Sequence, residues 1–132
     1  MRIAPLAIVA LAACDPFVVS QITLTASPSA STDSVRHDAT RIVDSLASLH
    51  GLASAPWAYG CSIGRAEGTR EGSWSAGSLW LTVCAVTLQP AQLQVYMKLP
   101  GVHWNAKGDS LRRELPAVLR ARFGADAVAV DR

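Results

Sequence analysis

Residues 78–99 read SLWLTVCAVTLQPAQLQVYMKL and decide the fold. Two apolar, partly β-branched runs flank Gln89-Pro90-Ala91-Gln92, a short segment with the composition of a turn. We therefore expect an antiparallel hairpin with one strongly apolar face, which helices must cover. Pairing about this turn sets Leu88, Val86, Cys84 and Thr82 against Leu93, Val95, Met97 and Leu99.

A third strand is expected upstream. Residues 57–66 have strand composition, and the glycine-rich segment 64–77, GRAEGTREGSWSAG, reads as a long solvated connection to the next strand. The opposite face of the resulting meander is partly polar, so it is either a binding surface or is covered by residues 17–25. On this reading that face carries Leu79, Leu81, Val83, Ala85, Gln94, Tyr96 and Lys98.

Two segments have helical periodicity. The first runs from Thr32 to Gly51 and the second from Asp109 to Phe123, with Gly51 and Gly124 as stops. Pro116 should kink the second helix or begin a new one, because proline lacks the backbone donor. The apolar stripes are Val35, Ala39, Ile42, Val43, Leu46 and Leu49 in the first, and Leu111, Leu115, Val118, Leu119 and Phe123 in the second.

The remaining segments lie towards the two ends. Residues 17–25 are β-prone and form either an edge strand or an extended tether, whereas residues 27–31, SPSAS, have linker composition. Residues 127–130 could add an edge strand. We predict an α+β fold in which two helices pack on one face of a small antiparallel sheet of three to five strands. Residues 32–132 would form a single domain, preceded by residues 14–31 as the lipidated N-terminus with tether or edge strand.

Composition excludes several classes. The 132 residues are 50% hydrophobic and 17% charged, which argues against disorder. Twelve basic residues against ten acidic ones are too balanced to indicate nucleic acid as a partner. No apolar run approaches the roughly 20 residues of a transmembrane helix.

Residues 1–14 read MRIAPLAIVALAAC. Arg2 precedes an uncharged and almost wholly apolar stretch, which is typical of a signal peptide. The stretch ends in Leu11-Ala12-Ala13-Cys14, which resembles the lipobox of bacterial lipoproteins. An ordinary cleavable signal, or a buried apolar strand, is the alternative interpretation.

The resemblance implies a processed and anchored protein. Residues 1–13 would be removed, and Cys14 would carry fatty-acyl chains on its thiol and its new amine. Several acyl chains give a stable anchor where one is marginal, so the lipid bilayer becomes a partner. The protein would be lipid-anchored in the cell membrane or the outer membrane, facing the periplasm or the exterior.

Lipidation of Cys14 would leave Cys61 and Cys84 in a compartment where disulfides persist. If these two face each other across a hairpin, its midpoint falls between Gly72 and Ser73, where a turn is expected. We therefore predict a Cys61–Cys84 disulfide, with Trp57 and Tyr59 on the face of Cys61. Two buried free thiols are the alternative, and no metal site or other cofactor is expected because no further Cys or His has ligand spacing.

No catalytic set is recognisable. Ser73-Trp74-Ser75-Ala76-Gly77 lacks the first glycine of a hydrolase elbow and leads into a strand where a helix is required. Glu67 and Glu71 fall in the expected loop, where no burial would raise a carboxyl pKa. The sequence predicts a non-enzymatic protein.

A few residues are candidates for binding. Trp74 is either a partner anchor on the long loop or packs over the sheet edge. His103 and Trp104 share a polar loop, and Arg112 and Arg113 lie on the basic side of the second helix, which is either a binding surface or a solvated face. We expect an envelope lipoprotein with a binding or adaptor domain for an envelope protein or glycan. The alternatives are a small-ligand binder or enzyme that uses the His103/Trp104 loop, and a purely structural surface lipoprotein.

Overall fold

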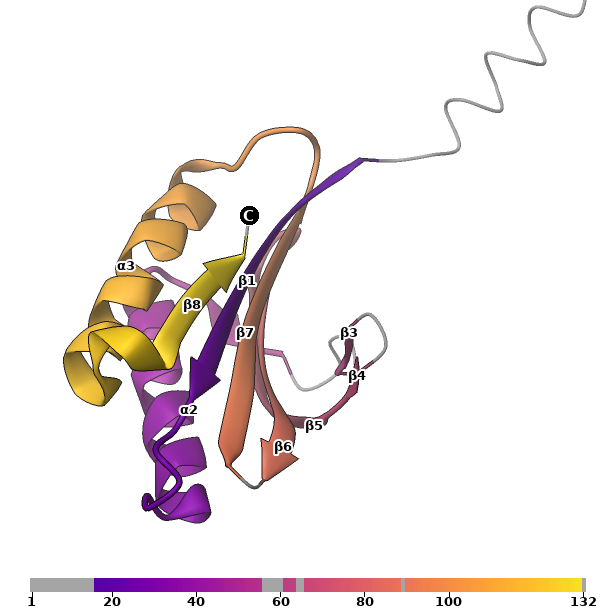
Figure 1. Cartoon of the computed structure of the whole chain (residues 1–132). Helices are drawn as coiled ribbons and strands as arrows, with labels where there is room; N and C mark the ends of the chain where they lie inside the picture. Colours follow the sequence, from indigo (N-terminus) through magenta and orange to yellow (C-terminus); the bar gives the residue numbers. More distant parts are fainter. Residues whose placement is uncertain (1–15, 56–60, 64–65, 89, 132) are drawn as a thin grey trace, which may run out of the picture.

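Figure 1 shows the computed structural model of the chain, which describes residues 16–55, 61–63, 66–88 and 90–131. The lipobox with Cys14 lies outside these residues, as do Trp57 and Tyr59. In chain order the elements are β1 (Phe17–Thr25), α2 (Thr32–Leu49), β2 (Ala53–Ser54), β3 (Ser62–Ile63), β4 (Ala66–Glu67), β5 (Thr69–Ala76), β6 (Leu79–Leu88), β7 (Ala91–Pro100), α3 (Ala106–Phe123), η1 (Ala125–Ala127) and β8 (Val128–Asp131).

The main sheet has the strand order β2-β5-β6-β7-β1-β8, and all its neighbours are antiparallel. The strands β3 and β4 pair separately as a small hairpin. The α+β prediction is confirmed, but the sheet has six strands in the described residues rather than three to five. The size was underestimated because residues 69–76, expected to be loop, form the strand β5.

Residues 17–25 form an interior strand. β1 pairs with β7 along its whole length and with β8 from Gln21 to Leu24, so it is neither a tether nor an edge strand. The C-terminal segment does form an edge strand, as predicted, because β8 pairs with β1 alone.

Both helices cover one face of the main sheet, whereas the β3–β4 hairpin lies on the other side (Figure 1). This confirms the predicted arrangement of the helices. The core lies between the two layers and includes buried apolar residues of α2, α3 and the four central strands. Its largest fully buried side chains are Ile22, Leu24, Val43, Leu79, Leu81, Val83, Leu93, Val95, Met97, Leu111, Leu115 and Leu119.

The helices end where their glycines predict. Gly51 and Gly124 have φ values of +78° and +103°, which a residue with a side chain rarely adopts. The alternative that a new helix begins at Pro116 is wrong, since α3 runs as one helix from Ala106 to Phe123, whereas a kink at Pro116 stays a prediction. The Pro116 ring is buried together with Leu115, so burial of apolar surface offsets the backbone hydrogen bond that proline cannot make.

The predicted register of the β6–β7 hairpin is also wrong. Leu81 lies opposite Met97 and Val83 opposite Val95, with an irregularity between Ala85 and Thr87. The core face of β6 therefore carries Leu79, Leu81, Val83 and Ala85, the set that the predicted register placed on the other face. Side chains alternate with a period of two, so a register shift by an odd number of residues exchanges the faces.

The Cys61–Cys84 disulfide is present, with Cα atoms 5.7 Å apart, although it does not join partner strands of a hairpin. The strand neighbours of Cys84 are Arg70 on β5 and Gln94 on β7. β5 and β6 turn at Gly77, which has a φ of +61° as two-residue hairpin turns require, and not at Gly72. The disulfide instead fastens the chain just before β3 to the sheet face that the helices leave uncovered.

Candidate functional site

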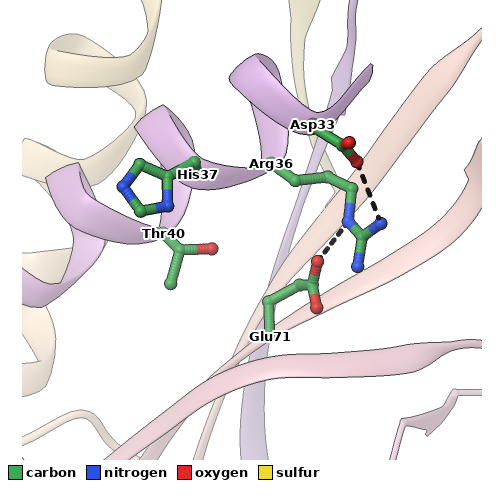
Figure 2. Close-up of a pocket in the computed structure, with 5 residues that line it drawn as sticks. All are labelled: Asp33, Arg36, His37, Thr40 and Glu71. Atoms are coloured by element: carbon green, nitrogen blue, oxygen red, sulfur yellow. Dashed lines mark hydrogen bonds and ion pairs between the residues drawn. The ribbon is translucent and has the colours of Figure 1, made fainter.

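A polar groove runs between α2 and β5. Two adjoining hollows, of about 310 and 360 Å³, share His37, Thr40 and Glu71 in their linings. We call this surface the α2–β5 groove. Its charged and aromatic residues are Asp33, Arg36, His37, Arg41, Asp44, Glu71 and Trp74, and Figure 2 shows the part nearest the start of α2.

Local structure explains why these side chains meet. Asp33, His37 and Thr40 are three or four residues apart on α2, so they lie on the same side of the helix. On β5 the pairing with β6 shifts between Arg70 and Gly72, which makes Glu71 the extra residue of a bulge. The bulge turns Glu71 toward the helix side, where it meets Arg36.

The ion pairs in the groove are internal. Arg36 donates a very short hydrogen bond from Nε to Oε1 of Glu71, and its Nη1 lies 3.8 Å from Oδ1 of Asp33 (Figure 2). The hydrogen bond to Glu71 raises the pKa of Arg36 above its ordinary value, so the guanidinium stays charged. Glu71 is thereby neutralised by a partly buried partner, which leaves its position fixed rather than its charge available.

Trp74 forms the floor at the other end of the groove. The side chain is only 4% exposed, and its Nε1 donates a 2.7 Å hydrogen bond to Oδ1 of Asp44. Thr40 has a buried Oγ1 without a hydrogen-bond partner in the described part of the chain. Because buried polar atoms are normally satisfied, this hydroxyl is an unpaired group in the wall of the groove, which a bound polar molecule would engage only if the Thr40 side chain turned toward it.

The Trp74 ring packs directly against Gly72, and we expect Gly72→Ala to displace the ring. An added Cβ would lie 2.6 Å from the Trp74 ring, so the indole would have to move. The expected cost is about 1–3 kcal/mol in the free energy of unfolding, with a change in tryptophan emission as the bond to Asp44 weakens. Urea denaturation followed by fluorescence measures both, with Ser75→Ala on the same strand as the control. A Gly72→Ala protein as stable as that control would contradict the packing described.

A second hollow lies beside the edge of β1. It has a volume of about 520 Å³ and is lined by Val19, Ser20, Trp104, Arg112, Arg113, Val130 and Asp131. We call it the Trp104 hollow. It brings together Trp104, Arg112 and Arg113 as binding candidates, whereas His103 is exposed and does not line it.

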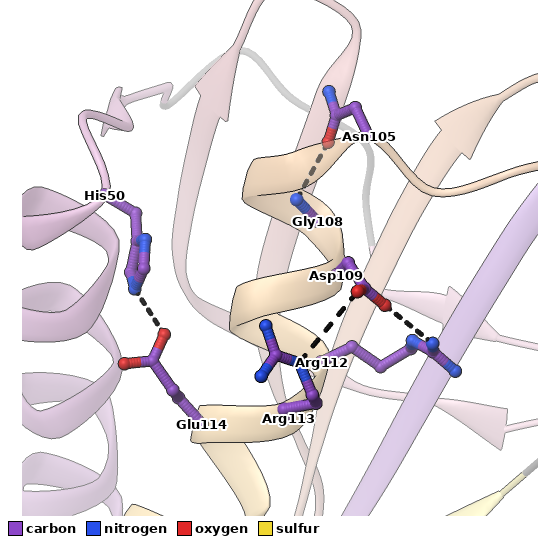
Figure 3. Close-up of polar contacts among 7 residues, drawn as sticks. All are labelled: His50, Asn105, Gly108, Asp109, Arg112, Arg113 and Glu114. Carbon is purple, nitrogen blue, oxygen red and sulfur yellow. Dashed lines mark hydrogen bonds and ion pairs between the residues drawn. The ribbon is translucent and has the colours of Figure 1, made fainter.

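Polar contacts order the start of α3 next to this hollow (Figure 3). Asn105 caps the helix by accepting a hydrogen bond from the Gly108 amide, and Arg112 bonds Asp109 at 2.8 Å. The bond from Arg112 lowers the pKa of Asp109, so this carboxylate is charged at neutral pH. Asp109 also lies 3.9 Å from Arg113, which means that two guanidinium groups share one carboxylate.

Two side-chain contacts link α2 to α3. Nε2 of His50 lies 2.6 Å from Oε2 of Glu114, close enough for an ion pair when His50 is protonated, though it does not meet hydrogen-bond geometry (Figure 3). Arg122 of α3 bonds Asp38 of α2 at 2.6 Å. These contacts fix the position of α2 over the sheet and with it the wall of the groove.

Sequence reasoning identified some of these residues and missed others. Trp74 lines the groove from a buried position on β5 instead of projecting from a loop. Arg36, His37, Thr40 and Glu71 were missed, since each lies on what reads as a solvated helix face or loop. The helical spacing of the α2 residues was the available signal, but nothing in the sequence indicated that Glu71 would face them.

No group of three or more His, Cys, Asp or Glu side chains in the described residues is placed to hold a metal ion. None of the helices there is both long and apolar enough to cross a membrane. Comparisons with protein-family profiles, curated proteins and solved structures find no match to this chain.

Proposed function

We propose that the protein is a membrane-anchored envelope lipoprotein whose α+β domain is a non-enzymatic binding module. It is held in the cell membrane or the outer membrane by acylated Cys14 and faces the periplasm or the exterior. The α2–β5 groove receives an envelope protein or glycan. The lipobox Leu11-Ala12-Ala13-Cys14 supports the anchor, and the groove supports the binding role.

The observation that carries this proposal is the separation of anchor and groove. Cys14 precedes the first residue of β1, Phe17, by three positions. Arg70, the neighbour of Glu71, lies opposite Cys84 on β6, and Cys84 lies opposite Gln94 on β7. Gln94 in turn lies opposite Thr23 on β1, which is six residues after Phe17. At the rise of a strand this is about 20 Å from Phe17, so the Glu71 end of the groove opens well away from the anchored end. The Trp74 end lies closer, because Trp74 aligns through Leu81 and Met97 with Ser20.

The chemistry of the groove favours binding over catalysis. Its strongest polar interactions join Arg36 to Glu71 and Trp74 to Asp44, which holds these groups in a fixed arrangement. Pre-arranged polar groups with one unsatisfied hydroxyl, Thr40, suit recognition of a polar partner. General acid–base catalysis needs a carboxylate that is available to move a proton, whereas Glu71 and Asp44 are held by Arg36 and Trp74.

Cross-linking in the native host tests the proposal. The full-length protein is compared with Asp33→Lys, which reverses a charge in the groove, and with Asp126→Lys, which makes the same change on the exposed 3-10 turn η1. We expect one envelope component to be captured by the wild type and by Asp126→Lys, and at least about fivefold less by Asp33→Lys, a difference of about 1 kcal/mol. Equal capture by all three would remove the groove from the function.

The anchor has a separate readout. Mass spectrometry of the amino end should find acylated Cys14, and Cys14→Ser should retain the unprocessed leader. An unmodified Cys14 in the native host would overturn the lipoprotein assignment whatever the groove binds.

A second candidate function is a small-ligand binder at the Trp104 hollow. Its support is the convergence of Trp104, Arg112 and Arg113 on one hollow of about 520 Å³. Two arginines beside an aromatic ring suit a small anion, which would compete with Asp109 and Asp131 for their guanidinium groups. Capture that depends on Arg112, and is unchanged by Asp33→Lys, would favour this candidate.

A further inference from the structure

Apolar side chains are exposed at the end of the sheet where β1 begins. Phe17, Val19 and Val102 are 45%, 47% and 65% exposed. We call these three residues and Lys98 the anchor-end patch. Four residues of β1, Phe17 to Ser20, extend beyond the stretch that β8 covers, which leaves this edge of the strand open within the described residues.

The register places Phe17, Val19 and Lys98 on one face of the sheet. Val19 lies directly opposite Lys98 on the sheet face that the helices do not cover, and the Lys98 ammonium lies 4.0 Å from the centre of the Phe17 ring. The amide of Gly101 donates a 2.9 Å hydrogen bond to the carbonyl of Pro16, so Val102, the next residue, lies at the same end of the sheet as the start of β1. Trp80 of β6, the other neighbour of Lys98, is partly exposed on this face.

This combination of side chains is typical of a membrane–water interface. Aromatic and aliphatic groups enter the boundary between headgroups and acyl chains, and a lysine keeps its ammonium at the level of the phosphates. A cation held over an aromatic ring presents both features at one point. An isolated exposed valine needs no explanation, but Phe17 and Val19 beside one cation, with Val102 exposed at the same end of the sheet, form a contact surface.

The short segment between Cys14 and β1 indicates that the bilayer is what contacts the anchor-end patch. Phe17 follows Cys14 by three positions, with only Asp15 and Pro16 between them, and even when fully extended this segment spans at most about 10 Å. If Cys14 is acylated, the bilayer surface is therefore within reach of Phe17 in every arrangement of the intervening residues. A partner protein would have to fit into that narrow space.

We propose that the anchor-end patch lies against the bilayer, with Phe17 and Val102 in the headgroup region and Lys98 on anionic phosphates. This inference rests on the proposed anchoring at Cys14 and adds the face by which the domain contacts the membrane. It orients the molecule, so that the strands of the sheet rise from the membrane and the Glu71 end of the α2–β5 groove lies at the far end.

Tryptophan quenching by brominated lipids tests the orientation. Full-length acylated protein is reconstituted in vesicles of phosphatidylcholine and phosphatidylglycerol, with or without bromine on the acyl chains. Phe17→Trp and Val102→Trp each add one probe at the patch, and Val118→Trp adds one to a 38% exposed site on α3, about 18 Å along the helix from its first residue. Circular dichroism confirms that each variant is folded.

We expect the emission added at positions 17 and 102 to fall at least about twofold in brominated vesicles, and the emission added at position 118 to be unchanged. Equal quenching at all three positions, or none at any, in protein that floats with the vesicles would overturn the orientation. Emission at position 17 that responds to protein concentration but not to bromine would assign the patch to a second copy of the chain. Protein that does not float would refute the anchor, and with it the proposed function, before quenching is measured.

Discussion

Breaking the Cys61–Cys84 disulfide is expected to lower the free energy of unfolding by about 3 kcal/mol. The bond joins residues 23 positions apart, and closing a loop of this length restricts the unfolded chain by about that amount. In the folded protein it fastens the β3–β4 hairpin to β6. Urea denaturation of the purified protein with and without reductant measures the difference, which should appear as a shift in midpoint.

A double variant separates the bond from the side chains. Cys61→Ala/Cys84→Ala should be as destabilised without reductant as the wild type is with it, and reductant should have no further effect on it. Cys14 is common to all samples, so it cannot account for a difference. A loss below about 1 kcal/mol in both comparisons would mean that the disulfide hardly constrains the unfolded chain.

The second large effect is expected for Leu81→Ala, which should cost about 3 kcal/mol. Leu81 is fully buried between Trp74 on β5 and Met97 on β7, beneath the helices. Its truncation leaves a cavity that the neighbouring strands cannot close, because their positions are fixed by the sheet. Thermal and urea denaturation both report the loss.

Val19→Ala is the matched control, since it also truncates an aliphatic side chain on a strand of the same sheet. Val19 is 47% exposed on the opposite face, so we expect a cost below about 1 kcal/mol. The pair distinguishes the observed register from the one that the sequence pattern predicted. A Leu81→Ala protein no less stable than Val19→Ala would place Leu81 outside the core.

The proposals assign different ends of the fold to different tasks. The anchor-end patch and the Trp104 hollow lie near the beginning of β1, whereas the α2–β5 groove starts at the first turn of α2. Because β1 and α2 run in opposite directions, the first turn of the helix lies at the end of the sheet remote from Phe17 (Figure 1). A partner bound at the Glu71 end of the groove would thus lie away from the bilayer.

The sequence by itself determined the elements whose signals are local. Both helices follow from apolar residues at helical spacing and end at Gly51 and Gly124, because only glycine adopts those φ values freely. The strands β6 and β7 follow from their apolar content around Pro90. The cysteine pair was found by counting, since two cysteines remain once Cys14 is assigned to the anchor.

Only the tertiary structure decided which face of β6 is buried. Both faces of this strand carry apolar side chains, Leu81 and Val83 on one and Trp80 and Cys84 on the other, so alternation could not choose between them. Only the tertiary structure also decided which side chains meet in the α2–β5 groove. A bulge on β5 turns Glu71 toward Arg36, 35 positions earlier in the chain, and no local pattern encodes a contact that forms only when the sheet and the helix pack.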